Sequence, residues 1–349
     1  MAMREALLYE KLPESRVQCH TCQWRCKISP GKYGVCGVYQ NQDGALFNLN
    51  YGLVSSMAAD PIEKKPLFHF HPGTSAFSLG SLGCNFHCRH CQNWEIAMAD
   101  TRTAQRGCQQ VSPEEQIALA ERHRCQGIAW TYNEPAVWFE YTLDSARLAK
   151  EHGLYTVYVT NGYSTPEALD KIGPYLDAWR VDVKGFSDEF YRKLAKVPRW
   201  REILNTARRA KRKWNMHVEV VTNVIPTLND DDAQLRGIAS WILRELGELT
   251  PWHVTRFHPD HRMLQYPATP LETIEHACMI GQEAGLKFVY TGNVPGHWRE
   301  NTVCYSCGSV VVEREGYNTR VVGLEGARCR FCGAELNFRN GGPKGVGDG

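Results

Sequence analysis

The cysteines of this chain are grouped, and their grouping constrains the fold more than any other feature. Of the fourteen cysteines, all but three fall into sets of four, three and four, and such sets in a reducing compartment indicate metal sites rather than disulfides. The set of three is Cys84, Cys88 and Cys91, spaced C-x3-C-x2-C. A [4Fe–4S] cluster takes one cysteine per iron, so three thiolates predict a cluster with one open iron. The alternatives are a zinc site completed by His87 or His90 and three unrelated buried thiols.

The first set of four lies near the N-terminus, spaced C-x2-C-x3-C-x9-C: Cys19, Cys22, Cys26 and Cys36. Glycines punctuate its second half, and we expect a loop-rich knuckle with too little apolar material for a core of its own. A bound metal would supply the missing folding free energy. Structural zinc and a second iron–sulfur cluster both fit four thiolates. Redox-active or unligated cysteines are the remaining alternative.

The second set of four consists of two C-x2-C knuckles near the C-terminus: Cys304, Cys307, Cys329 and Cys332. This pattern predicts a zinc ribbon, with rubredoxin-type mononuclear iron as the alternative. Between the knuckles, residues 309–313 and 319–322 predict a hairpin. The three remaining cysteines, Cys108, Cys125 and Cys278, are expected to be small buried apolar residues.

The middle of the chain alternates strand-like and helix-like stretches. Predicted strands lie at 76–79, 127–131, 155–160, 178–183, 217–221, 254–257 and 287–290. Between them are helix start signals such as Ser112-Pro113, with Glu115 three residues after the serine, a capping box with proline at the first helical position. Ser164 to Glu167 repeats this pattern, and a run of aspartates at 230–232 precedes another helix. The alternation predicts an α/β fold, a full or partial parallel (β/α) barrel.

Polar residues follow the predicted strands, at the edge where a β/α barrel carries its active site. The cysteine loop follows the first strand. Glu134 follows the second, in a turn that could also be a helix cap, and Thr160 and Asn161 follow the third. Later strand ends carry Asp182, Lys184 and His258. A structural salt bridge is the alternative for the Asp182–Lys184 pair.

Composition excludes two classes of function. The net charge of +2 gives no electrostatic basis for binding nucleic acid. No run approaches the roughly 20 apolar residues of a membrane helix, and the N-terminal residues lack the apolar stretch of a signal peptide. We therefore expect a cytoplasmic protein. The expected domains are a knuckle region at 1–74, the barrel at 75–298, the ribbon at 299–340 and a disordered tail at 341–349.

With these motifs, the chain resembles the radical S-adenosylmethionine (radical SAM) superfamily, whose hallmark is the C-x3-C-x2-C loop after the first barrel strand. Its middle region resembles pyruvate formate-lyase activating enzyme. The whole chain is similar to the radical enzyme of the AmmeMemoRadiSam system, which combines an N-terminal knuckle, a Cys84-to-Cys91 loop continuing through Gln92 to Ile96, a Tyr-Asn-Glu-Pro turn and a C-terminal ribbon.

The resemblance implies a role for each candidate residue. Cys84, Cys88 and Cys91 would bind three irons, and S-adenosylmethionine (SAM) would chelate the fourth. His90 would lie near adenine, where the superfamily often has an aromatic residue. Glu134 would bind the methionyl amine, although only this Glu of the superfamily's Gly-Gly-Glu motif is retained. The methionyl carboxylate and ribose would be contacted by Thr160, Asn161, Asp182, Lys184 and His258.

The implied activity is reductive cleavage of SAM to methionine and a 5′-deoxyadenosyl radical, which abstracts hydrogen from a substrate. Installing a glycyl radical on a partner protein is one hypothesis, and modifying a small molecule or peptide is another. A zinc-stabilised scaffold is the alternative from a different class. The implied partners are a flavodoxin or ferredoxin as electron donor, together with Memo-family and AMMECR-family proteins.

Overall fold

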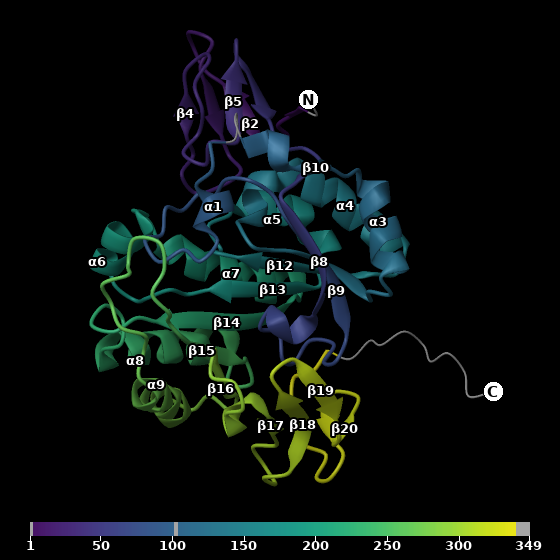
Figure 1. The fold of residues 1–349 in the computed structure, drawn as a ribbon, viewed down its shortest axis with the longest axis vertical. Coiled ribbons are helices and arrows are strands. Elements are labelled where there is room, and N and C mark those ends of the chain that lie inside the picture. The colour runs from purple at the N-terminus through teal and green to yellow at the C-terminus, as the bar shows by residue number, and fades with distance from the viewer. Residues whose placement is uncertain (1–2, 101–103, 340–349) are drawn as a thin grey trace, which may run out of the picture. The chain divides into compact units, whose positions relative to one another are not determined.

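The computed structural model describes residues 3–100 and 104–339, so the 341–349 tail lies outside the described residues. The chain forms two compact units, each assembled from separate stretches. The first contains Met1–Ala59, Ala76–Trp179 and Arg192–Met216. The second contains Asp60–Ser75, Arg180–Tyr191 and His217–Gly349. Figure 1 labels many of the helices and strands of both units.

The first unit holds the first part of a parallel β/α arrangement. Its strands neighbour one another in chain order: β9 (Ser75–Gly80), β11 (Gly127–Trp130), β12 (Tyr155–Thr160) and the start of β13 (Ala178–Asp182). At the edge, β8 (Ser56–Pro61) runs antiparallel to β9, because the amides of Ser55 and Ile62 donate to the carbonyls of Gly80 and Thr74. Strand β11 pairs in parallel with β9 and β12. Helices alternate with the strands: α1 (Trp94–Ala97), α3 (Pro113–Arg122), α4 (Phe139–Glu151), α5 (Pro166–Ile172) and α7 (Arg201–Trp214). Parallel neighbours need such crossovers.

Local sequence explains where these helices begin. The Ser112 hydroxyl accepts a hydrogen bond from the Glu115 amide at 3.2 Å, and the Glu115 carboxylate accepts one from the Ser112 amide at 2.7 Å. This is the predicted capping box at the start of α3. At α5 the capping residue is Thr165, whose hydroxyl accepts from the Ala168 amide at 3.1 Å.

The N-terminal segment of the first unit has more order than the sequence predicted. Its short strands are β1 (Arg4–Glu5), β2 (Tyr9–Lys11), β3 (Val17–Cys19), β4 (Lys27–Ile28), β5 (Tyr39–Gln42), β6 (Ala45–Asn48) and β7 (Leu53–Val54), with β10 (Gln109–Gln110) pairing with β7. They build the small sheets β2-β3-β4 and β1-β6-β5. A small apolar core including Val17, Ile28 and Leu46 packs between them. The expectation that this segment has no core of its own is therefore wrong.

Glu140, a fully buried residue of α4, fastens this segment to its unit. Its carboxylate accepts hydrogen bonds from the Leu7 amide at 3.0 Å, the Tyr39 hydroxyl at 2.8 Å and the Asn48 side chain at 2.8 Å. Burial raises the pKa of Glu140, and these three donors oppose the rise. All three donors come from the first 48 residues, so the segment and α4 depend on each other.

The second unit continues the parallel pattern. The end of β13 is followed by β14 (His217–Val224), β15 (Trp252–Arg256) and β16 (Val289–Gly292), which neighbour one another in that order. The helices of this unit are α6 (Asp188–Phe190), α8 (Asp232–Trp241) and α9 (Leu271–Glu283). Single turns of other helix types occur in both units, at Ile62–Lys64, Gln105–Gly107, Pro135–Trp138, Gly173–Tyr175, Tyr191–Ala195, Ile242–Leu246 and Trp298–Glu300. Each predicted strand of the middle region overlaps an observed one, so the α/β class with a parallel sheet is confirmed.

The ribbon of the second unit has five short strands: β17 (Thr302–Val303), β18 (Val310–Glu315), β19 (Asn318–Val321), β20 (Leu324–Glu325) and β21 (Arg328–Cys329). Cys329 lies in β21, and the other three ribbon cysteines lie in the turns and loops beside the strands. Strands β18 and β19 form the predicted antiparallel hairpin. Cys304 and Cys329 share an apolar cluster with Phe68, Phe288 and Tyr290, so this region packs on its own unit. Among the described residues, no helix is long and apolar enough to cross a membrane.

Candidate active site

Three residues separate β9 from Cys84, the first cysteine of the loop. The last of them, Gly83, sets the backbone direction at the start of the loop. Gly83 has φ +81°, a conformation that glycine adopts without strain. A Cβ atom there would lie 2.6 Å from the Val38 side chain and 2.7 Å from the Cys36 carbonyl oxygen. No other residue fits without moving the backbone, so the loop starts in direct contact with the N-terminal segment.

Asn133 clamps the beginning of the loop. Its side-chain nitrogen donates to the Gly83 carbonyl at 2.8 Å and to the Ser81 hydroxyl at 3.0 Å, while its side-chain oxygen accepts from the Ser81 amide at 3.1 Å. Further along, the amides of His87 and Arg89 donate to the carbonyls of Ala195 and Leu194. These bonds fix the backbone on which the cysteines stand.

Asn85 joins the loop to two other segments of the first unit. Its carbonyl accepts from the Trp24 indole at 2.7 Å, and its side-chain oxygen accepts from the Asn161 side chain at 2.7 Å. The Asn161 side chain also lies 3.9 Å from the Cys84 sulfur. Two of the predicted site residues, Cys84 and Asn161, are therefore neighbours.

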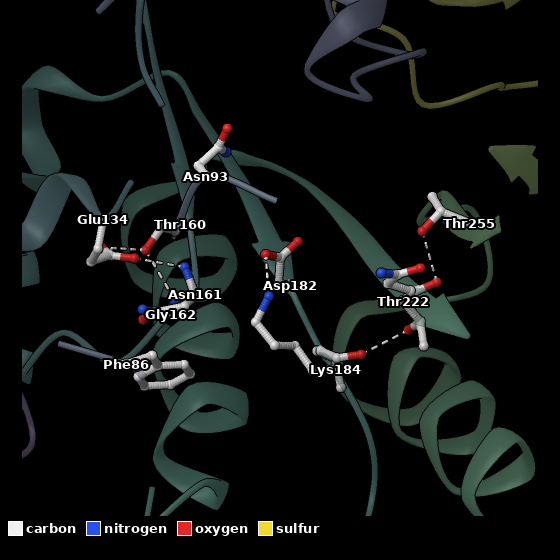
Figure 2. Close-up of polar contacts among 12 residues, drawn as sticks. Phe86, Asn93, Glu134, Thr160, Asn161, Gly162, Asp182, Lys184, Thr222 and Thr255 are labelled. Atoms are coloured by element: carbon white, nitrogen blue, oxygen red, sulfur yellow. Dashed lines mark hydrogen bonds and ion pairs between the residues drawn. The ribbon is translucent and has the colours of Figure 1, made fainter. Parts of the chain in front are cut away.

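Glu134 is the centre of a polar network at the ends of β11 and β12. Its side chain is 1% exposed, and its carboxylate accepts from the Thr160 hydroxyl at 2.8 Å, the Asn161 amide at 2.7 Å and the Ala136 amide at 3.0 Å. The Thr160 hydroxyl accepts in turn from the Gly162 amide at 2.9 Å. Figure 2 shows Glu134 directed at Thr160 and Asn161. The structure thus brings these three predicted residues together.

Three of the remaining predicted site residues, Asp182, Lys184 and His258, belong to the second unit. The Lys184 ammonium lies 2.8 Å from the Asp182 carboxylate (Figure 2), and Arg180 contacts the other oxygen of the same carboxylate. The salt bridge considered from the sequence is therefore present. His258 follows β15 and is exposed, and among the described residues no hydrogen bond or ion pair of His258 is found. His90, in the cysteine loop, is buried.

Comparison with known proteins now decides the family. The radical SAM superfamily model matches residues 79–236, which contain both the cysteine loop and the Glu134 network. The chain is 43% identical to the uncharacterised protein MJ0808 of Methanocaldococcus jannaschii, over 96% of this chain and 99% of that one. This chain belongs to the radical SAM superfamily.

Other matches to this radical SAM enzyme are more distant. The pyruvate formate-lyase-activating enzyme of Clostridium pasteurianum is 23% identical and aligns over 55% of this chain and 82% of its own length. A solved radical SAM methyltransferase from Sphaerobacter thermophilus has 17% identity and a TM-score of 0.49, covering 69% of this chain and 71% of that one.

The residues of the radical SAM loop suit an iron–sulfur cluster. Cys84 and Cys91 are partly buried, Cys88 is buried, and none of the three forms a disulfide. Burial, and then the nearby Glu134 carboxylate, raise the pKa of Cys84 well above its usual value. A thiolate at this position therefore needs a cation beside it, and iron would supply that positive charge.

Sequence reasoning missed three residues that support the loop in this radical SAM enzyme. They are Trp24, Asn85 and Asn133, and none of them carries a charge or a metal-binding atom. Trp24 and Asn133 donate to backbone carbonyls that are distant in sequence, and the Asn85 side chain accepts from the Asn161 side chain. For Asn133 a signal existed, since it stands directly before Glu134 in a turn after a strand. For Trp24 the signal was its position between two cysteines of the N-terminal set.

The ribbon of the radical SAM enzyme holds four sulfurs that all lie within 4.8 Å of one another: Cys304, Cys307, Cys329 and Cys332. After each knuckle a glycine with positive φ, Gly308 or Gly333, donates its amide to the carbonyl of the first cysteine of that knuckle. The Cys307 sulfur is exposed, and the Ser309 hydroxyl and backbone lower its pKa to about 6, whereas burial raises the pKa of Cys304 to about 12. This group can hold a metal ion.

Proposed function

We propose that the chain holds a [4Fe–4S] cluster through Cys84, Cys88 and Cys91, and binds SAM beside it for reductive cleavage. When bound, the cluster would supply the electron for cleavage of the sulfonium, and the cleaved SAM would supply the means to abstract hydrogen from a substrate. The observation that carries this proposal is the contact between the three-thiol loop and the Glu134 network through Asn161.

The chain's own residues bind and orient in this proposal. Glu134 would receive the methionyl amine, because it is a buried carboxylate held in place by three hydrogen bonds. Thr160 and Asn161 position that carboxylate. His90 would contact adenine. Asp182, Lys184 and His258 are proposed for the carboxylate and ribose, and the existing ion pair means that SAM would share Lys184 with Asp182.

Two relatives are named for activating glycyl-radical enzymes or pyruvate formate-lyase, and this favours a protein substrate on which a glycyl radical is installed. Modification of a small molecule or peptide is the second candidate. Membership of the superfamily disfavours a scaffold with only structural metals.

We further propose the AmmeMemoRadiSam subgroup, Memo-family and AMMECR-family partners, a flavodoxin or ferredoxin donor, a cytoplasmic location and zinc in the ribbon.

The first test is Cys88→Ala in the full chain, reconstituted anaerobically with iron and sulfide. We expect production of 5′-deoxyadenosine from SAM under dithionite to fall to background, because the cluster loses one of its three ligands. The matched control is Cys125→Ala, a buried cysteine outside the three sets, which should retain activity within about twofold of the unchanged chain. Full activity of Cys88→Ala would refute the assigned cluster.

The second test concerns the substrate. The wild-type chain is incubated anaerobically with SAM and either a candidate partner protein or a pool of small molecules. A partner-dependent rise in 5′-deoxyadenosine, with a glycyl-radical signal in electron paramagnetic resonance, would support activation of a protein. A rise only with small molecules would replace that proposal by the second candidate.

A further inference from the structure

We propose that Cys19, Cys22, Cys26 and Cys36 hold a second iron–sulfur cluster, packed against the loop that carries the first. The four cysteines line one cavity together with the apolar side chains of Ile28, Val35 and Tyr39 and the indole of Trp24. No disulfide joins them. Four thiols that line one cavity are a complete ligand set for a cluster with no open iron.

The sulfurs of this set lie in a largely buried environment that contains hydrogen-bond donors. Cys19 is buried, and the other three cysteines are partly buried. The backbone amides of Trp24 and Tyr39 hydrogen-bond to the sulfurs of Cys22 and Cys36. Buried sulfurs that receive amide hydrogen bonds are suited to ligating iron, and such bonds also tune a cluster's potential.

The spacing of the sulfurs separates a cluster from a single ion. In the ribbon, Cys304 and Cys332 have sulfurs 3.6 Å apart, and Cys307 and Cys329 have sulfurs 3.7 Å apart. Zinc–sulfur bonds of about 2.3 Å in a tetrahedron place sulfurs about 3.8 Å apart, so the ribbon fits one ion.

The N-terminal set differs from the ribbon in this respect. Within residues 3–100 and 104–339, the ribbon set is the one group of cysteines whose sulfurs all lie within 4.8 Å of one another. Neither the N-terminal set nor the Cys84–Cys91 loop meets that limit. Thiolates on separate irons stand farther apart than thiolates on a single ion, so the N-terminal set lacks the close spacing that fits a single ion in the ribbon.

The segment that carries the N-terminal set contacts the first cluster's loop at two points. The Cys36 carbonyl occupies the space where a side chain at position 83 would lie, directly before Cys84. The Trp24 indole, between two of the ligands, donates to the Asn85 carbonyl directly after Cys84. Both contacts lie within the first unit. The segment Gly83–Asn85 is thus held between the N-terminal set and Asn161.

This position suits the entry of electrons, a role that rests on the proposed function. A one-electron donor of the ferredoxin or flavodoxin class would be oxidised while it reduces the N-terminal cluster. That cluster would return to its oxidised state when the same electron passes to the cluster at Cys84, Cys88 and Cys91. One electron enters and one electron reaches the sulfonium, so no further oxidant or reductant is needed.

The deciding experiment measures metals rather than activity. The full chain and its triple variant Cys84→Ala/Cys88→Ala/Cys91→Ala are reconstituted anaerobically, and iron, acid-labile sulfide and zinc are determined for each. We expect about eight irons in the wild type and about four in the triple variant, at four irons per cluster. A triple variant that binds no iron, or two zinc ions per chain, would overturn the proposal.

Electron paramagnetic resonance on the same samples tests proximity. After reduction, the wild-type spectrum should differ from the sum of the spectra of the triple variant and of Cys22→Ala/Cys26→Ala, because two neighbouring paramagnets broaden each other. An additive spectrum would exclude the contact between the clusters. If the Cys22→Ala/Cys26→Ala chain fails to fold, the iron count of the triple variant decides alone. Absence of SAM cleavage in a wild type that carries eight irons would refute the proposed function but leave this inference standing.

Discussion

At the scale of single residues, the site depends on uncharged side chains that hold backbone atoms. Asn133 makes three hydrogen bonds to Ser81 and Gly83, so the turn that ends β11 fixes the loop that follows β9. Tyr132, next to it, has φ +71°, a conformation that costs energy for a residue with a side chain. Its carbonyl accepts from Asn93, just after the cysteine loop, at 2.7 Å. The strained turn thus holds both ends of the loop.

Replacing Asn133 tests whether this turn positions the cysteine loop. Asn133→Ala should reduce stability by about 1–3 kcal/mol, because it leaves buried partners without hydrogen bonds. The fraction of chains that retain the cluster, measured as iron content after gel filtration, should also fall. This loss of iron should be detectable before the binding of SAM changes. Asn205→Ala, at an exposed position of α7, is the control. Unchanged iron content in Asn133→Ala would show that the clamp does not position the cysteines.

At the scale of elements, a buried carboxylate joins the starts of β14 and β15 to the segment at Phe68. Glu219 is fully buried and accepts from His217 at 2.9 Å, His253 at 2.6 Å and the amides of Phe68 and His69 at 3.0 and 2.8 Å. Burial alone would raise the pKa of Glu219, but the hydrogen bonds from the two histidines outweigh it and hold the pKa well below its usual value. Burial lowers the pKa of His253.

Stability should therefore fall in acid. A lowered carboxyl pKa stabilises the fold above the unfolded value of about 4.3, and that contribution is lost as the pH falls through the folded pKa. Glu219→Gln should cost about 3 kcal/mol at neutral pH, since it replaces a buried carboxylate that accepts four hydrogen bonds. The difference in stability between Glu219→Gln and the unchanged chain should become smaller below about pH 4.3.

Thermal melting across pH measures this dependence. The control is Glu121→Gln, because Glu121 forms an exposed pair with His152 that contributes under about 1 kcal/mol. Equal losses of stability in Glu219→Gln and Glu121→Gln would show that the buried network contributes no more to stability than an exposed ion pair.

The elements were predictable to the extent that local sequence determines them. Strands β11 and β12 are short apolar runs between turns, and α3 begins at a capping box, so pattern alone located them. The strands of the first 54 residues are two to four residues long, too short to show a period of two. The Asp182–Lys184 pair was predictable from spacing along one strand, whereas the contacts of Asn85 and Asn133 depend on residues far along the chain.

At the scale of the whole molecule, the N-terminal segment is part of the first unit rather than an appendage. Glu140 receives all three of its described partners from the first 48 residues. The loop at Gly83 packs against Cys36. A sequence can suggest separate modules by its cysteine spacing, but it does not show which buried carboxylate they share.

Removing residues 1–59 should take away these donors and open the Glu140 carboxylate to water. We expect the shortened chain to accumulate in the insoluble fraction, as measured by fractionation after expression, because apolar side chains that face the segment, such as Val137, become exposed. A soluble, monomeric shortened chain would contradict this dependence.

Gly83 has a consequence for recognising relatives of this protein. The space for a side chain before the first cluster cysteine is taken by the Cys36 carbonyl and by Val38. Any homologue that keeps the N-terminal segment docked in this way must have glycine there, whereas one that has lost or displaced the segment is released from that requirement. The residue before the first cysteine of the loop is thus a single-letter marker, readable in genome data, for which relatives still carry the docked segment.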